Sequence, residues 1–376
     1  MPLAPERPGF SLIERWQSLR DRLLANSAFQ SWAVKFPLTR GIANRRARAL
    51  FDLCAGFVYS QVLAACVKLN VFEILSEGPQ TTERLAGRLS LTVEAAARLL
   101  DAAAALKLVE RRRGGRFGLG PLGAAILGAP GVVAMIEHHA MLYADLRDPV
   151  ALLRGQQPET GIGSLWPYAA EGGETLKASD VADYSALMST SQPQVSADIL
   201  AAYRFDKHQC LMDMGGGEGT FLTAVAPTAP NLRLKLLDLP AVAERARAKF
   251  AAAGLSGRAE AFGGDFRAGP LPEGADIISL VRVIHDHDDE FAMAILRNAH
   301  KALPPGGTLL LAEPMAGTAG AETVGAYFDF YLLAMGSGRP RTVEELTAML
   351  KRAGFSSVTL QPTRRTMLVR VLIAKV

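Results

Sequence analysis

A glycine-rich stretch in the second half of the chain sets the strongest limit on how this sequence can fold. In residues 211–220, Leu-Met-Asp-Met-Gly-Gly-Gly-Glu-Gly-Thr, a short apolar run is followed by glycines at alternate positions, Gly215, Gly217 and Gly219. A helical pattern begins at Phe221. A strand, a glycine turn and a helix in this order are typical of a nucleotide-binding crevice, because glycine lets the backbone turn with positive φ and approach a ligand closely.

Strands and helices alternate along the chain from this stretch onward. The expected strands are residues 211–214, 232–238, 259–262, 276–283, 308–313 and 368–375, and the expected helices are residues 221–225, 242–253, 290–303 and 342–353. Such alternation predicts the α/β class, with an open, mainly parallel, Rossmann-like sheet. The ligand of such a sheet lies at the carboxyl ends of its strands.

The spacing of the glycines and one acidic residue indicate which nucleotide binds. A dinucleotide fold requires Gly-x-Gly-x-x-Gly, but residue 220 is Thr220, and the sequence has no Gly-Lys-Ser/Thr to hold phosphates. Asp238 ends the next strand, where a carboxylate can accept hydrogen bonds from both hydroxyls of a ribose. Together these features favour S-adenosylmethionine, which carries no phosphate, as the cofactor.

Residues 71–122 show the order helix, helix, helix and hairpin that is typical of a winged helix. DNA binding is the obvious function of this arrangement, but the expected recognition helix, residues 93–106, is rich in alanine and has only Arg98 and Lys107 as nearby cations. DNA affinity depends mainly on phosphate contacts from Lys and Arg. We therefore expect dimerisation or substrate enclosure here, and no nucleic-acid partner.

Four regions are expected along the 376-residue chain. They are a basic helical arm (residues 1–48), a winged-helix-like dimerisation domain (49–125), a helical linker that encloses substrate (126–204) and the catalytic domain (205–376). The net charge is +4, and residues 1–50 alone contain nine Lys or Arg against three Asp or Glu. This uneven distribution predicts an interaction surface in the arm rather than a basic groove through the whole protein.

Apolar side chains recur at helical spacing in residues 11–27, and this basic amphipathic helix is expected to pack on its own domain or on a partner subunit. Contact with an anionic membrane surface is the alternative. The amino terminus lacks the apolar core of a signal peptide, and apolar stretches such as residues 57–67 are expected to be too short to span a bilayer. Three widely separated cysteines without metal spacing indicate a reducing, cytoplasmic location.

Residues 50–376 resemble the class I, S-adenosylmethionine-dependent small-molecule O-methyltransferases of plant and bacterial type. The shared motifs are Asp-Met-Gly-Gly-Gly-Glu-Gly, Asp238-Leu239-Pro240, Gly264-Asp265-Phe266, Val283-Ile284-His285-Asp286, Leu303-Pro304-Pro305-Gly306-Gly307 and Ala312-Glu313. Within that family, residues 334–342 (Ala-Met-Gly-Ser-Gly-Arg-Pro-Arg-Thr) and the basic arm most resemble the carotenoid O-methyltransferases of phototrophic bacteria, of the hydroxyneurosporene or demethylspheroidene type. The resemblance implies S-adenosylmethionine as cofactor, a lipophilic acceptor, a homodimer, and a cytoplasmic enzyme whose arm can touch the inner or photosynthetic membrane.

The resemblance also assigns roles to individual residues. His285 matches the catalytic base, and Glu313 matches the acid that orients it. The cofactor positions are Gly215 near the methionine moiety, Asp238 at the ribose, Asp265 and Phe266 at the adenine, and Arg282 at a contact usually made by lysine. Two positions depart from the family pattern, because the tryptophan that often follows His-Asp is His287 here, and the second supporting acid is Pro340. Whether Glu313 alone supports His285 is left open by the sequence.

The position of His285 after the strand 276–283 places it at the carboxyl edge of the sheet, where a cofactor and an acceptor meet. The pKa of histidine is about 6.5 and that of an alcohol is close to the value of water, about 15.7. Full deprotonation of an alcohol by His285 would therefore cost roughly 12 kcal/mol. For an alcohol, proton removal is therefore expected to be concerted with methyl transfer, whereas a phenol would cost only about 5 kcal/mol.

Three further interpretations complete the prediction. No metal is expected, because consecutive side chains in residues 285–290 rarely converge on one ion and the acids at its end suit helix capping. Candidates for an apolar acceptor pocket are Met188, Tyr327, Phe328, Tyr331 and Met335, although such stripes also occur in simple cores. The alternatives to a carotenoid enzyme are a methyltransferase of phenolic, polyketide or tetrapyrrole acceptors, and a winged-helix regulator that senses S-adenosylmethionine.

Overall fold

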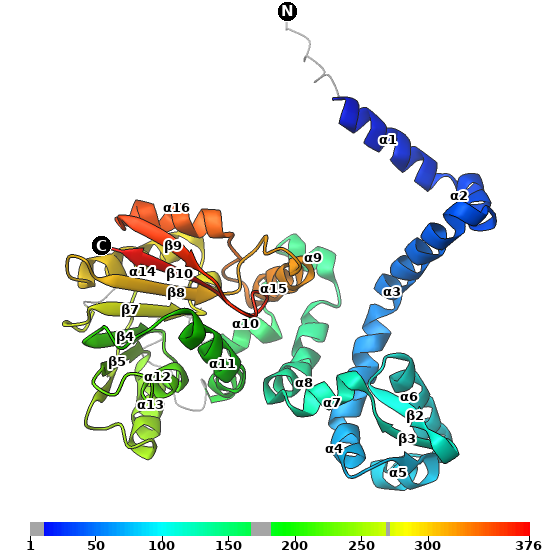
Figure 1. The fold of residues 1–376 in the computed structure, drawn as a ribbon, viewed down its shortest axis with the longest axis horizontal. Helices are drawn as coiled ribbons and strands as arrows, with labels where there is room; N and C mark the ends of the chain where they lie inside the picture. Colours follow the sequence, from blue (N-terminus) through cyan, green and yellow to red (C-terminus); the bar gives the residue numbers. More distant parts are fainter. Residues whose placement is uncertain (1–10, 167–181, 268–270) are drawn as a thin grey trace, which may run out of the picture. The chain divides into compact units, whose positions relative to one another are not determined.

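The computed structural model of the chain describes residues 11–166, 182–267 and 271–376, and the side chains of all of these except residues 182–191. The chain folds as two compact units, Met1–Ala124 and Ala125–Val376. The first contains the arm and the winged helix, and the second contains the large sheet with its covering helices (Figure 1).

Three helices begin the first unit, namely α1 (Leu12–Ala25), α2 (Ser27–Lys35) and α3 (Pro37–Lys68). A capping box between Ser11 and Glu14 starts α1, and the side chain of Asn26 accepts from the amide of Phe29 to start α2. No residue of α1 is buried, so its apolar stripe does not pack on its own domain within the described part of the chain, and packing on a partner subunit stays a prediction.

The third helix runs unbroken across the expected boundary at residue 48. Ser60 and Gln61 lie inside this helix. They do not interrupt it, because its backbone hydrogen bonds continue past single polar side chains. By length and composition α3 is long and apolar enough to cross a membrane, with 11% of its most apolar window buried. The sequence-based expectation that this region is too short was therefore wrong.

The winged helix has the predicted order of elements. It comprises α4 (Val71–Ser76), β1 (Gln80–Thr81), α5 (Thr82–Leu89), α6 (Val93–Ala105), β2 (Val109–Arg112) and β3 (Arg116–Leu119). Thr81 and Thr92 cap α5 and α6 through backbone amides three residues ahead. The three strands pair antiparallel in the order β1-β3-β2, and Leu85, Leu100 and Phe117 are buried in the core of this region.

Five helices lead from the winged helix to the large sheet: α7 (Pro121–Leu127), α8 (Pro130–Asp145), α9 (Pro149–Leu153), α10 (Gly161–Leu165) and α11 (Ala182–Ala202). The short α10 lies within the predicted helical linker, in a segment rich in glycine. It forms because Thr160 caps its first turn and the carboxylate of Asp145 accepts from the amides of Gly161 and Ile162 at 2.7 and 2.9 Å.

The second unit is built on a seven-stranded sheet with the order β6-β5-β4-β7-β8-β10-β9. Its strands are β4 (Cys210–Met214), β5 (Arg233–Asp238), β6 (Ala259–Gly263), β7 (Ile277–Val281), β8 (Thr308–Glu313), β9 (Ser357–Gln361) and β10 (Arg370–Lys375). The first five pair parallel, and β10 is antiparallel to both β8 and β9. The predicted α/β class and mainly parallel sheet are confirmed; β9 was missed.

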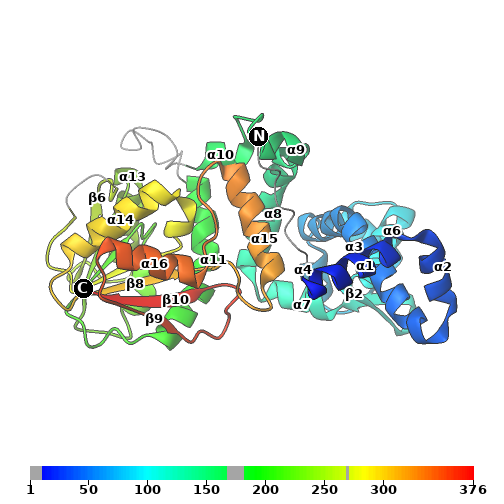
Figure 2. The same cartoon turned by 90° about the horizontal axis from the view of Figure 1, so that it is seen from above.

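Helices cover both faces of this sheet (Figure 1). The helices between the strands are α12 (Thr220–Val225), α13 (Pro240–Ala252), α14 (Asp289–Ala302), α15 (Glu322–Met335) and α16 (Val343–Ala353). Successive side chains of a strand point to opposite faces, so Leu211 packs with α11, α12 and α13 while Met212 packs with α14 and α16. Figure 2 shows α15 lying beside α8, away from the sheet strands.

Candidate active site

The carboxyl ends of β4 and β7 form the point at which the sheet changes direction. From β4 the chain builds outward through β5 and β6, and it then returns to β4's other side through β7 and β8. Open α/β sheets bind ligands at such a switch point. Five of the seven predicted catalytic and cofactor residues end or follow β4, β5, β7 or β8 at this edge.

Gly215 lies at the centre of this edge, directly after β4. Its φ is 69°, and its amide donates to the carbonyl oxygen of Leu237 at 2.8 Å. A Cβ atom at this position would lie 2.8 Å from Val283 Cγ2 and 3.6 Å from Phe266 Cε1. Glycine therefore suits this position for two reasons: its backbone is left-handed, and a side chain would collide with Val283. The contact of Gly215 with the cofactor stays a prediction.

Asp238 ends β5 and is completely buried. Its two oxygens accept from the amide of Gly217 at 2.8 Å and from the amide of Leu239 at 2.7 Å. The carboxylate therefore fixes the glycine loop to the next strand. The ribose contact of Asp238 stays a prediction.

Asp265 does not stand alone at the presumed adenine end. It forms a bidentate pair with Arg267, whose Nε donates to Oδ1 at 2.9 Å and whose Nη2 donates to Oδ2 at 2.8 Å. Burial opposes ionisation of this carboxyl, but the hydrogen bonds from Arg267 outweigh burial and lower the pKa of Asp265. Sequence reasoning missed Arg267, although a cation two residues from a predicted ligand-binding acid is a signal that could have found it.

Three rings gather beside Asp265. The ring of His287 lies 6.2 Å from Phe266 and 6.0 Å from Trp166, centroid to centroid. Burial lowers the pKa of His287 to about 4, so its imidazole is neutral at physiological pH. Trp166, at the end of α10, is thus a site neighbour that no local sequence signal indicated.

Arg282 follows β7 directly and has a left-handed backbone with φ of 60°. For a residue with a side chain this conformation costs about 1–2 kcal/mol, and such strain tends to persist at functional sites. The amide of Arg282 donates to the carbonyl oxygen of Ala312 in β8 at 2.8 Å, which holds the strained residue at the sheet edge. Its cofactor contact stays a prediction.

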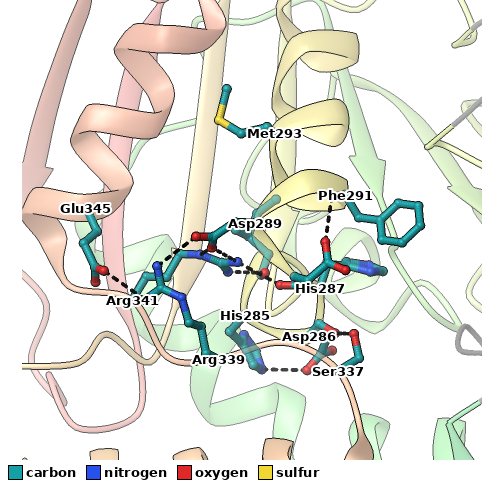
Figure 3. Close-up of polar contacts among 12 residues, drawn as sticks. His285, Asp286, His287, Asp289, Phe291, Met293, Ser337, Arg339, Arg341 and Glu345 are labelled. Atoms are coloured by element: carbon teal, nitrogen blue, oxygen red, sulfur yellow. Dashed lines mark hydrogen bonds and ion pairs between the residues drawn. The ribbon is translucent and has the colours of Figure 1, made fainter.

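His285 lies in a short 3-10 turn after β7 and is buried between two carboxylates, one of which, Asp286, is seen beside it in Figure 3. Its Nδ1 is 3.3 Å from Glu313 Oε2, which also accepts from the His285 amide at 3.1 Å. Its Nε2 is 3.1 Å from Asp286 Oδ1. The structure thus brings His285 and Glu313 together, and it adds a second acid, Asp286, from the same turn. A second carboxylate thus contacts His285 although residue 340 is Pro340.

The two carboxylates control the protonation of His285. Burial by itself lowers the pKa of this imidazole, but Asp286 and Glu313 outweigh burial and raise the pKa to about 10. The other oxygen of Glu313 is buried and has no hydrogen-bond partner, so this carboxylate is committed to His285 alone. With these two carboxylates as its charged neighbours, His285 is therefore protonated, as an imidazolium, near neutral pH.

Two of the predicted pocket residues, Tyr327 and Tyr331, lie where α15 packs against α8. The hydroxyls of Tyr327 and Tyr331 lie 2.8 and 2.9 Å from the Nε2 atoms of His139 and His138, respectively. Phe328 places its ring 6.4 Å from that of His285, while Met335 is buried in an apolar cluster with Trp166. Met188 belongs to α11, and its side chain lies outside the described residues. Acceptor contacts of these residues stay predictions.

Two observations concern other ligand sites in the described chain. Among the residues whose side chains are described, no group of three or more His, Cys, Asp or Glu is arranged to hold a metal ion. A surface cavity of about 600 Å³ lies at the amino-terminal edge of the sheet, beside Asp276 and Leu303, and none of the predicted site residues lines it.

Comparison with known proteins gives concordant results. Residues 143–356 match the family model of the O-methyltransferase domain, and residues 51–128 match the O-methyltransferase dimerisation domain. The chain is 44% identical to the demethylspheroidene O-methyltransferase of Cereibacter sphaeroides, over 96% of this chain and 94% of that protein. It is 40% identical to the enzyme of the same name from Rhodobacter capsulatus, over 100% and 94%. The SAH-bound structure of CalO1, a methyltransferase in calicheamicin biosynthesis, matches with a TM-score of 0.70 and 26% identity, over 88% of this chain and 98% of that one.

Proposed function

Because the chain belongs to the O-methyltransferase family, we propose that it transfers the methyl group of S-adenosylmethionine to a hydroxyl of a lipophilic acceptor, a hydroxylated carotenoid of the hydroxyneurosporene or demethylspheroidene type. The observation that carries this proposal is the identity of 44% to a demethylspheroidene enzyme over nearly the whole chain. The regulator alternative lacks support, because both family matches describe an O-methyltransferase.

The residues at the sheet edge fit the cofactor. In this proposal Gly215 lies near the methionine moiety, Asp238 at the ribose and Phe266 at the adenine, and all three lie at the carboxyl edge of the sheet. When bound, S-adenosylmethionine supplies an electrophilic methyl group and its own leaving group. The chain's part is to align the acceptor oxygen with that methyl group and to take up the proton.

His285 takes up the proton in this proposal. Glu313 accepts the hydrogen of Nδ1 and so fixes the tautomer in which Nε2 is the basic nitrogen. Nε2 points toward Asp286, which stabilises the imidazolium once the proton has moved. A positive charge bound beside His285 lowers its pKa, because like charges disfavour the protonated form. The free base is therefore expected to be more populated in the cofactor complex than in the free enzyme.

Asp286→Asn is expected to move the acid limb of the pH profile to lower pH. Turnover requires neutral His285, so kcat/KM rises as pH passes the histidine pKa, and the Asp286 charge holds that pKa high. Removing the charge lowers the pKa, while asparagine keeps a hydrogen-bonding group near Nε2. The profile of kcat/KM from pH 6 to 10 measures this shift.

Asp288→Asn is the matched control for that experiment. Asp288 lies two residues further along and caps α14 through the amide of Phe291, a role that asparagine also fills. An unmoved acid limb in Asp286→Asn, or an equal shift in Asp288→Asn, would contradict the assignment of the limb to His285.

We further propose that the arm docks on an anionic membrane at the cytoplasmic side, where a lipophilic acceptor resides. The apolar side chains of α1 are exposed, from 43% for Leu23 to 84% for Leu12, and Trp16 is of the type that anchors helices at membrane interfaces. Arg15, Arg20 and Arg22 give this helix its basic character.

The exposed apolar residues of α3 beyond residue 50 fall in the matched dimerisation region, and we assign them to contact with a second copy of the chain. A monomer in sedimentation velocity would exclude that assignment.

The arm is expected to pellet the protein with vesicles that contain anionic lipid and not with neutral vesicles. Each basic residue near such a surface contributes about 1 kcal/mol, so replacing Arg15, Arg20 and Arg22 by glutamine should weaken binding by roughly 100-fold. The same change at the exposed hairpin residues Arg111, Arg112 and Arg113 removes equal charge elsewhere. Equal losses in both triple variants would show attraction by net charge alone and would refute docking through α1.

The acceptor is tested with methyl-labelled S-adenosylmethionine and a panel of hydroxylated carotenoids and phenols in detergent micelles. We expect label in the carotenoid products. Label in phenols only would overturn the carotenoid assignment and favour the phenolic alternative, while label in neither would contradict both.

A further inference from the structure

A segment far along the chain lies against the turn that carries His285. The turn, called here the histidine turn, is residues 284–287, and the segment, called the clamp, is residues 337–341 between α15 and α16 (Figure 3). The clamp donates a hydrogen bond to each of the four consecutive carbonyl oxygens of the turn. The donors are Arg341 Nη1 to Ile284 at 2.7 Å, the Arg339 amide to His285 at 2.9 Å, the Ser337 hydroxyl to Asp286 at 2.9 Å and Arg341 Nη2 to His287 at 2.8 Å.

The histidine turn makes only long hydrogen bonds within its own part of the chain. The amide of Asp286 donates to Val283 at 3.2 Å, and the amide of His287 donates to Ile284 at 3.3 Å. These distances lie at or beyond the upper end of the usual range for N–H···O bonds, whereas the bonds from the clamp lie inside it. The clamp therefore supplies shorter hydrogen bonds to the turn than the turn makes within itself, beside the bond from the His285 amide to Glu313 at 3.1 Å.

Gly338 permits this close contact. Its φ is 80°, and a Cβ atom there would overlap the carbonyl oxygen of His285 and the backbone of Asp286. These are backbone atoms, which cannot move aside without displacing the turn. The clamp and the turn thus touch through their main chains, and glycine is the residue that allows it.

Arg341 is the centre of the clamp. It is fully buried, and its two terminal nitrogens reach the carbonyls on either side of His285 and Asp286. Asp289, the first residue of α14, holds the guanidinium through Nε at 3.0 Å and Nη2 at 2.7 Å. Burying an arginine is costly unless its donors are paired, and the planar fork of arginine matches this set of acceptors in a way that lysine cannot.

We propose that Arg341 is a positioning residue for His285: it fixes the histidine turn from behind, so that the imidazole keeps its place between Asp286 and Glu313. The proposal rests on the proposed role of His285 as the base. The groups that face His285 are Asp286 and His287 from its own turn and Glu313 from β8, with Phe328 of α15 closing one side. Neither nitrogen of Arg341 touches the imidazole, so Arg341 acts only through the backbone.

Arg341→Lys tests this proposal in the full-length enzyme, because lysine keeps the charge and loses the fork. We expect kcat to fall by about 10- to 100-fold, as a misplaced catalytic group typically causes, with little change in KM for S-adenosylmethionine. We also expect the acid limb of the pH profile to move to lower pH, because looser contacts with Asp286 and Glu313 lower the pKa of His285. Ser337→Ala removes one of the four donors at little risk to folding and should shift both quantities less, in the same direction.

Arg258→Lys is the matched control. Arg258 also holds backbone carbonyls with its guanidinium, those of Ala226, Ala229 and Leu232, at a distance from the histidine turn. It should change thermal stability without moving the pH profile. Wild-type kcat and pH profile in both Arg341→Lys and Ser337→Ala, or an equal shift in Arg258→Lys, would overturn the proposal. If His285→Ala itself keeps wild-type turnover, the role of His285 as base has failed instead.

Discussion

His285→Ala is expected to lower kcat by about 10²- to 10⁴-fold, the range that a positioned general base contributes. The imidazole is the group that Glu313 and Asp286 hold at the carboxyl edge of the sheet, and alanine leaves no base there. The affinity for S-adenosylmethionine should stay close to that of the wild type, because the cofactor positions on β4 and β5 do not depend on the imidazole. Steady-state turnover and cofactor titration by calorimetry measure the two effects separately.

His300→Ala serves as the control for this variant. His300 lies near the far end of α14 against Phe355, with ring centroids 5.0 Å apart, and touches none of the predicted site residues. It should lose some stability and keep its turnover. Turnover of His285→Ala near that of the wild type would contradict the role of His285 as base.

Asp238→Ala is expected to weaken the binding of S-adenosylmethionine by at least about 10-fold, with the larger losses near 100-fold. A hydrogen bond to a charged group contributes about 1.5–3 kcal/mol, and 1.4 kcal/mol corresponds to a tenfold change in affinity. Part of the loss comes from the glycine loop, because the Gly217 amide loses its acceptor. Calorimetry with the purified variant measures the change in Kd.

Asp276→Ala separates the cofactor contact from a loss of local structure. Asp276 also accepts from two backbone amides, those of Gln209 and Cys210 at 3.0 and 2.7 Å, but it lies at the opposite edge of the sheet. Its variant should lose stability and keep its Kd. Equal weakening of cofactor binding in both variants would contradict a ribose contact of Asp238.

Much of the fold was predictable from local patterns. Alternating apolar strands and amphipathic helices are encoded in short windows of sequence, so the ends of β4 through β8 were all predicted to within a few residues. β9 was missed because Ser357–Gln361, Ser-Val-Thr-Leu-Gln, is a largely exposed edge strand without an apolar face. The continuity of α3 was missed because polar side chains within an apolar stretch were given more weight than helical hydrogen bonding.

The sequence predicted which site residues lie close together only where their position at the end of a strand determines it. The proximity of His285 and Glu313 follows from the pairing of β7 with β8, which a parallel sheet implies. The contact of Asp286 with His285 depends on the 3-10 turn, and that turn is held by residues 337–341, more than 50 positions further along the chain. The approach of Trp166 to His287 likewise joins distant segments. No local pattern encodes such contacts.

A competition assay tests the central claim most directly. Wild-type enzyme is given a hydroxylated carotenoid and a phenol together, with limiting S-adenosylmethionine, and the methylated products are quantified by mass spectrometry, which yields the ratio of the two kcat/KM values. We predict methyl ether formation predominantly on the carotenoid, and loss of that product in His285→Ala. Predominant methylation of the phenol, or a carotenoid ether that persists undiminished in His285→Ala, would contradict the account.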